Sequence, residues 1–123
     1  MIEYGQLVGM WQLVRATRRS RADDSVTDMF SANPRGRLLY TPDGGVSATI
    51  EKVAGTGEIA VCYVGRASLA DDVVTHHVEV GNANYPDGTT LVRHAALGAN
   101  GELNLSVDYP DSTGALVWQR VAA

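Results

Sequence analysis

Cysteine is almost absent from this sequence, and so are long apolar runs and an excess of positive charge. The chain of 123 residues has one cysteine, Cys62, so no internal disulfide can form. We expect Cys62 to act as a small hydrophobic residue, because it lies in the apolar run IAVCYV. The formal net charge is −4. This charge disfavours nucleic acid as the main partner, because phosphate binding requires a basic surface.

No segment has the properties of a membrane span or a secretory leader. No apolar run approaches the ~18 residues that cross a bilayer as a helix. The first residues, MIEYGQLVGMWQL, have neither a basic start nor a long apolar core. We therefore expect a cytoplasmic protein with no membrane partner.

Helical periodicity is also almost absent, apart from one short turn, GQLV, near the start. The chain instead shows short runs with period-two alternation, separated by Gly, Pro, Asn and Asp, which is typical of strands. The predicted strands are 11–19, 36–41, 45–51, 58–69, 73–80, 89–97, 102–108 and 114–121. Six of the seven links between successive runs are short, such as the Pro-Asp-Gly turn at 42–44. We expect one domain, 1–123: an all-β, eight-stranded antiparallel up-and-down barrel, closed so that no strand edge is left unpaired.

The one long connection is 20–34, between the first and second predicted strands. A connection of this length in a compact domain is usually functional or disordered. It contains Val26, Met29 and Phe30, which are costly to leave in water. We favour a lid over one mouth of the barrel, and the alternative is a loosely held loop.

Two adjacent histidines in the run VVTHHVEV must point to opposite faces of the sheet, because side chains alternate along a strand. The face with His76 also carries Val74, Val78 and Val80, so we place His76 in the lumen and His77 outside. The same test places polar Tyr40, Tyr63 and Arg93 inside, among apolar side chains. The predicted general acid–base or orienting groups are His76, Tyr40 and Tyr63, and the predicted ligand contacts are Arg93, Trp118, Leu38, Val78, Leu105 and Phe30.

Structural roles remain open for the two most polar of these residues. His76 could be a buried neutral imidazole bonded to a tyrosine or a backbone group. Arg93 could pair with a protein acid such as Glu79 outside the barrel. A metal site at His76 and His77 is not expected, because neighbours on a strand cannot share one ion. No phosphate loop, dinucleotide fingerprint or nucleophile elbow is present, so no cofactor is expected.

Several motifs, in order along nearly the whole chain, resemble those of the short bacterial lipocalin-like domain proteins of the lipocalin superfamily. They read LVGMWQL, GRLLYTPDGGVSATI, YVGRA, VTHHVEV, NYPDGTTLVRH and LVWQR. The resemblance implies that Trp11 closes the barrel base and that Arg120 packs over its ring. Two departures are a short segment at 51–57 and one extra residue in NYPDGT, and the first is expected to leave that side of the barrel more open.

The resemblance implies two kinds of function. Related barrels bind small molecules, so the first hypothesis is a barrel that holds a small hydrophobic molecule with a polar or acidic end. Others are cyclases or isomerases, so the alternative is a cofactor-free enzyme that acts on a natural-product, polyketide-like intermediate. We also expect a weak homodimer through an outer sheet face with Val92, Val117 and Val121.

Overall fold

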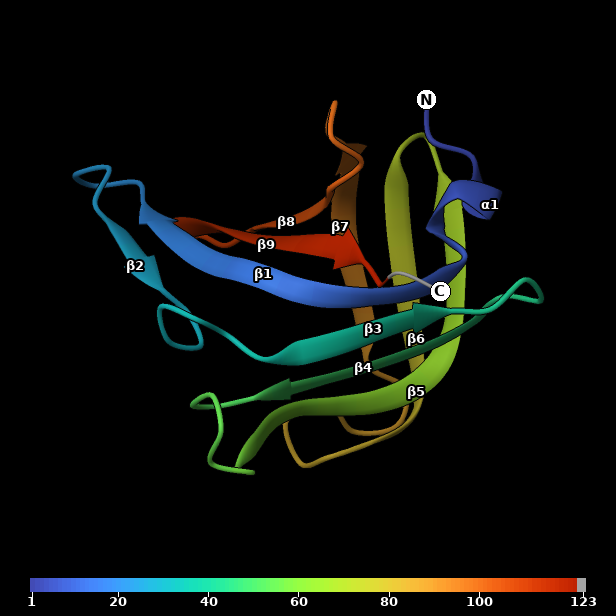
Figure 1. Ribbon diagram of the computed structural model, residues 1–123, viewed down its shortest axis with the longest axis horizontal. Helices are drawn as coiled ribbons and strands as arrows, with labels where there is room; N and C mark the ends of the chain where they lie inside the picture. Colours follow the sequence, from blue (N-terminus) through green and yellow to red (C-terminus); the bar gives the residue numbers. More distant parts are fainter. Residues whose placement is uncertain (122–123) are drawn as a thin grey trace.

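The computed structural model describes residues 1–121, which form one short helix and nine strands (Figure 1). The elements are α1 (Tyr4–Leu7), β1 (Gly9–Ser20), β2 (Val26–Asp28), β3 (Gly36–Tyr40), β4 (Gly45–Glu51), β5 (Ile59–Ala70), β6 (Val73–Gly81), β7 (Thr90–Leu97), β8 (Leu103–Asp108) and β9 (Ser112–Arg120). Eight of these strands correspond to the eight predicted runs. The additional strand is β2, which lies in the long connection at 20–34, where alternation predicted no strand.

The strands close into an antiparallel barrel in which neighbours in sequence are neighbours in space. From β3 to β9 each strand pairs with the next, and β1 pairs with β3 on one side and with β9 on the other. β9 pairs along one edge of β1, and on the other edge the first residues of β1 pair with β3 and the later ones with β2. In Figure 1, β1, β3, β4 and β9 run across the view, β6 and β7 run up it, and β5 curves between the two directions. The predicted fold class is confirmed.

One end of the barrel is closed by α1 and by residues from both ends of the chain. The indole Nε1–H of Trp11, which is fully buried, donates to the Leu7 carbonyl at 2.8 Å. The Arg120 guanidinium lies 4.2 Å from the centre of the Trp11 ring and donates to the carbonyls of Val8 and Gln6. A guanidinium can make both contacts at once, because its face binds the ring while its N–H groups point outward in the plane. The packing of Arg120 over Trp11 is confirmed.

Inward side chains form one core that lines the lumen from end to end. Its buried members include Leu38 and Ile50 from the β3–β4 hairpin, and Leu103 and Leu105 from β8. Cys62, expected to act as a small hydrophobic residue, faces solvent. The reason is alternation along β5, which places the neighbours Val61 and Tyr63 inside.

One irregularity in strand register reverses the faces that simple alternation predicts. Between β5 and β6 the register shifts after Val64, and Val80, expected inside, is 68% exposed. A bulge inserts one residue into one strand, so the alternation of faces restarts beyond it. Val117, expected on an exposed row, is buried without such a reversal, since Leu116 and Trp118 on either side of it still face the lumen.

Candidate ligand-binding site

The lumen contains a cavity of about 60 Å³ toward the end opposite α1. Its wall is mostly apolar, and the polar side chains in it are three tyrosines, His76, Arg93 and Trp118. The lining residues are Met29, Phe30, Leu38, Ala48, Ile50, Val61, Tyr63, His76, Tyr85, Arg93, Leu105, Val107, Tyr109, Leu116 and Trp118. An apolar wall with a few polar groups is the usual composition of a small-molecule site.

His76 is one of the two most deeply buried polar residues in this wall, and it is the one of the two adjacent histidines that faces inward. It is 2% exposed, whereas His77 faces solvent. Its Nε2 lies 2.7 Å from the Tyr40 hydroxyl oxygen, and its Nδ1 lies 2.7 Å from the Tyr63 hydroxyl oxygen. Burial, together with the nearby charges of Arg93 and His77, lowers the pKa of His76 to about 3. The imidazole is therefore neutral at physiological pH.

The two tyrosines that hold His76 are also kept in their neutral form. Burial raises the pKa of both Tyr40 and Tyr63 well above the ordinary value, and the positive charge of Arg93 lowers each by a smaller amount. Tyr40, His76 and Tyr63 thus form a neutral hydrogen-bonded chain across the core. The three residues come from β3, β6 and β5, so only barrel closure brings them together.

Arg93 carries the one positive charge in the cavity wall. It points inward from β7, opposite Val74 of β6, and its Nη1 donates to the neighbouring Val92 carbonyl at 3.0 Å. Within residues 1–121 it forms no ion pair, and in particular none with Glu79. Most of its N–H groups therefore have no protein acceptor.

Trp118 contributes a second unpaired donor. The residue is 2% exposed and lines the cavity, yet its Nε1–H has no hydrogen-bond partner in the described part of the chain. A buried donor without an acceptor is unfavourable, so such groups usually meet a water molecule or a ligand.

The predicted site residues lie mostly around this cavity. Seven of them line it: Phe30, Leu38, Tyr63, His76, Arg93, Leu105 and Trp118. Tyr40 and Val78 are buried in the same core but are not part of the lining. Tyr40 reaches the cavity only through His76. Whether any of these residues contacts a ligand stays a prediction.

Four side chains cover the mouth of the barrel, and they also line a second hollow of about 350 Å³ outside it. The four are Met29, Phe30, Tyr85 and Tyr109, from the connections after β2, β6 and β8. Met29 and Phe30 belong to the segment that we expected as a lid, and both pack against the core. Val26 of the same segment is half exposed in the short β2.

Sequence reasoning missed Tyr85 and Tyr109, because both lie in loops where alternation assigns no face. Tyr85 packs on Tyr63, with ring centres 5.3 Å apart, and Tyr109 lies under the Arg18 guanidinium. Both begin a Tyr-Pro-Asp triplet, at 85–87 and at 109–111. This repeated triplet in two connections at the same end of the barrel was the available signal.

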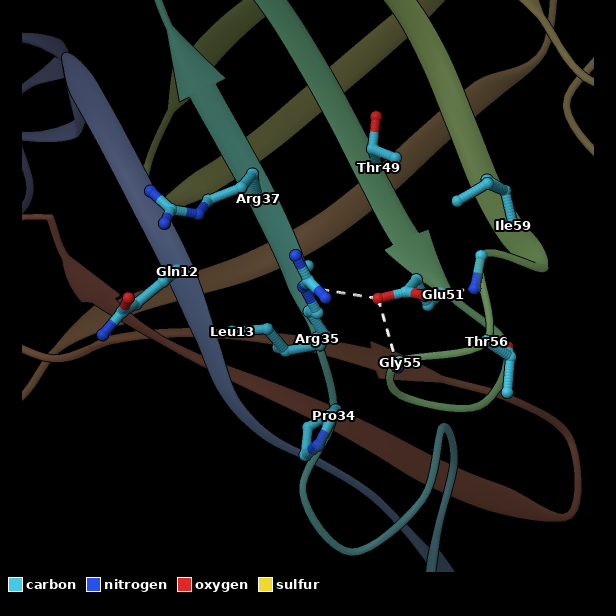
Figure 2. A pocket seen from close by; sticks show the side chains of 12 residues that line it. Gln12, Leu13, Pro34, Arg35, Arg37, Thr49, Glu51, Gly55, Thr56 and Ile59 are labelled. Carbon is cyan, nitrogen blue, oxygen red and sulfur yellow. Dashed lines mark hydrogen bonds and ion pairs between the residues drawn. The ribbon is translucent and has the colours of Figure 1, made fainter.

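A third hollow lies outside the barrel, beside the short 51–57 segment that we expected to leave this side open (Figure 2). It is wide, about 920 Å³, and its walls are β1, β3, the end of β4 and the β4–β5 loop. Glu51 lies in it and accepts hydrogen bonds from Gly57 N–H at 2.7 Å and Gly55 N–H at 3.4 Å, with Arg35 at 3.4 Å. These groups, Gly57 first, hold the pKa of Glu51 below its usual range. Glu51 thus has protein partners on each side and orders the loop.

Residues 1–121 contain no group of three or more His, Cys, Asp and Glu that could hold a metal ion. No helix in the same residues is long and apolar enough to cross a membrane. No family model matches the chain, and no curated protein matches it.

Proposed function

We propose that this protein is a lipocalin-like barrel that binds a small molecule with an apolar body and a polar or acidic end in its lumen. The observation that carries the proposal is Arg93, which has no ion-pair partner among residues 1–121 and lines a mostly apolar cavity wall. Its guanidinium is only partly buried, so water can reach it in the empty barrel, and an anionic group of a ligand would replace that water with a charge-assisted hydrogen bond. The motif resemblance to lipocalin-like proteins supports the same proposal.

The size of the cavity sets a condition on this function. The cavity of about 60 Å³ is much smaller than the roughly 300–1,000 Å³ of ordinary ligand pockets. Met29, Phe30, Tyr85 and Tyr109 separate it from the outer hollow of about 350 Å³. Displacement of the Met29–Phe30 segment would join the two spaces, so binding of a molecule larger than a few atoms requires the mouth to open.

The test is native mass spectrometry of the protein purified from its own host, beside the variant Arg93→Ala. We expect a bound small molecule on the wild-type chain and its loss from Arg93→Ala. Arg37→Ala is the matched control, because Arg37 lies on the outer surface of β3 and should leave binding unchanged. A wild-type barrel that stays empty, and whose melting temperature no small apolar acid raises, would overturn the proposal, because a ligand of the native state must stabilise it.

A second candidate function, a cofactor-free cyclase or isomerase, is supported by the Tyr40–His76–Tyr63 chain. A neutral imidazole between two hydroxyl groups can shift protons along the chain, and so polarise or protonate a bound carbonyl or enol. If the bound molecule is a substrate, His76→Ala should slow its conversion by ~10²-fold or more. An unchanged rate in a folded variant would remove His76 from the mechanism.

A further inference from the structure

The two hydrogen bonds of His76 have a direction that the burial of their partners decides. A neutral imidazole carries one ring proton, so it donates to one tyrosine oxygen and accepts from the other tyrosine O–H. The tyrosine that accepts must then donate its own hydroxyl proton elsewhere. The two tyrosines differ in whether they can do so.

Tyr40 has no second place to donate. It is 0% exposed, it does not line the cavity, and within residues 1–121 its hydroxyl has His76 Nε2 as its one hydrogen-bond partner. If Nε2 carried the proton, the Tyr40 O–H would be left buried without an acceptor, which is strongly unfavourable. Tyr40 O–H therefore donates to Nε2, and the ring proton sits on Nδ1.

Tyr63, in contrast, lines the cavity. With the proton on Nδ1, His76 donates to the Tyr63 oxygen at 2.7 Å, and the Tyr63 O–H is free to point into the lumen. In the Tyr40–His76–Tyr63 chain, the Tyr40 O–H and the His76 Nδ1–H then each have an acceptor. The Tyr63 O–H has none, and it faces the space where a ligand would lie.

Two other polar groups of the wall are donors only. Trp118 brings its unpaired Nε1–H, and Arg93 brings guanidinium N–H groups and a positive charge. The hydroxyl groups of Tyr85 and Tyr109, at the mouth, can donate or accept. Among the described residues that line the cavity, none has a carboxylate or amide side chain. The lumen therefore offers a ligand several hydrogen-bond donors and few side-chain acceptors.

We propose that the Tyr40–His76–Tyr63 chain, with the proton of His76 on Nδ1, makes the lumen a donor-rich site that selects a carboxylate on a small apolar molecule. This inference rests on the proposed function, since it names the ligand class of the same cavity. A carboxylate accepts from Tyr63, Trp118 and Arg93 and brings no proton that needs an acceptor. An alcohol brings such a proton, and an ammonium group is repelled by Arg93. Tyr40 is a positioning residue, because it acts on the ligand only through His76.

The first arm of the test measures the tautomer without any ligand. Long-range ¹H–¹⁵N correlation spectra of the ¹⁵N-histidine-labelled full chain distinguish a protonated Nδ1 from a protonated Nε2. The His76 signal is assigned by its absence in His76→Gln. We expect Nδ1–H as the main form, and a main form with Nε2–H would overturn the direction of the chain.

The second arm measures selectivity with three probes on one skeleton: phenylacetate, 2-phenylethanol and 2-phenylethylamine. By titration calorimetry we expect phenylacetate to bind at least about tenfold more tightly than the alcohol, and the amine not to bind. Tyr63→Phe should reduce this preference. Tyr4→Phe is the control, because Tyr4 lies outside the cavity and its hydroxyl donates to the Thr41 carbonyl.

The outcomes separate this inference from the proposed function. Equal or tighter binding of the alcohol, or a preference that survives Tyr63→Phe, would overturn the carboxylate-selective, donor-rich site and leave ligand binding intact. Binding of none of the three probes would count against both the carboxylate preference and the proposed function. The tautomer measurement would still decide the direction of the chain.

Discussion

His76 and His77 are adjacent in sequence, yet they lie in opposite environments. His76 is enclosed by Tyr40 and Tyr63, and His77 faces solvent. Charging His76 would require an imidazolium to lose its hydration and to lie near Arg93, which is why its pKa falls to about 3. The same burial that makes His76 a hydrogen-bond relay therefore makes the folded state sensitive to acid.

We predict that the stability of the barrel falls as the pH drops below the ordinary histidine pKa of 6.5. Between 6.5 and about 3 the unfolded chain binds a proton at residue 76 that the folded chain excludes, so acid favours unfolding. The contribution of neutral His76 to the free energy of unfolding is fully present above pH 6.5. It is lost, by up to ~1.4 kcal/mol per pH unit, as the pH falls through this range.

The measurement is the free energy of urea unfolding at pH 7.5, 6.5 and 5.5 for three proteins. The wild type and His77→Asn should show the same decrease, because residue 77 is exposed in both states. His76→Gln, which cannot titrate, should show a smaller one. A wild-type stability that is flat between pH 7.5 and 5.5 would show that His76 is not held neutral.

At the scale of elements, the strand that sets the shape of the site is β5, which curves between the two strand directions of the barrel (Figure 1). The register of β5 against β6 shifts between Val64 and Gly65, and Gly65 lies opposite Val78. A Cβ at Gly65 would collide with the His77 carbonyl oxygen. The absence of a side chain at Gly65 thus lets the backbone of β6 at His77 approach β5 closely.

We predict that Gly65→Ala destabilises the barrel by about 2 kcal/mol or more, because backbone has to move to relieve the overlap. Gly5→Ala is the matched control, since a Cβ there meets nothing within 4 Å and lies in α1, where alanine is favoured. Chemical denaturation of both variants measures the difference. A Gly65→Ala protein as stable as the wild type would show that the close approach is not required.

The connection between β1 and β3, which includes β2, also shapes the site. Its Met29 and Phe30 lie between the cavity and the outer hollow. Ser31 follows with a φ of 81°, a backbone conformation that non-glycine residues seldom adopt. This geometry turns the chain immediately after the two side chains that cover the mouth.

We predict that Phe30→Ala speeds the association of the apolar anionic dye anilinonaphthalene sulfonate by roughly threefold or more, because entry no longer waits for the ring to move. Stopped-flow fluorescence measures the rate constant. Ile59→Ala, which truncates an exposed side chain of the third hollow, is the control and should leave the rate unchanged. Equal rates for Phe30→Ala and the wild type would refute the role of Phe30 as a gate.

At the scale of the whole molecule, closure joins the first and last strands. β1 and β9 pair from Trp11 opposite Arg120 to Ser20 opposite Ser112. Arg120 adds a contact to the Trp11 ring and hydrogen bonds to the carbonyls before β1. One side chain near the end of the chain thus holds the segment where the barrel begins.

We predict that Arg120→Ala lowers the free energy of unfolding by about 2 kcal/mol, the sum expected for a cation–π contact and charge-assisted hydrogen bonds that are partly exposed. Arg120→Lys should recover little of it, because an ammonium group lacks the planar N–H array. Arg37→Ala should change stability by less than about 0.5 kcal/mol. Urea unfolding compares the variants, and full recovery by lysine would contradict the role of the planar group.

The strand pattern, the barrel and the inward position of His76 could be predicted from the sequence, because each depends on local alternation or on residues in regular strands. The closed end was predicted from the resemblance of the motifs around Trp11 and Arg120. Alternation failed at Val80, where a bulge depends on how two strands meet and not on either strand alone. It also gave no signal for Tyr85 and Tyr109, because loops have no period.

What only the tertiary structure decided is which polar groups meet. The sequence places Tyr40, Tyr63 and His76 inside, but their separation along the chain does not say that two hydroxyl groups bracket one imidazole. Nor does it say that Trp118 Nε1–H has no protein acceptor or that Arg93 has no ion-pair partner among the described residues, since pairing depends on distances that closure of the barrel sets. Strand faces are a local property and follow from the sequence, whereas hydrogen-bond partners across a barrel are a global property and follow from the fold.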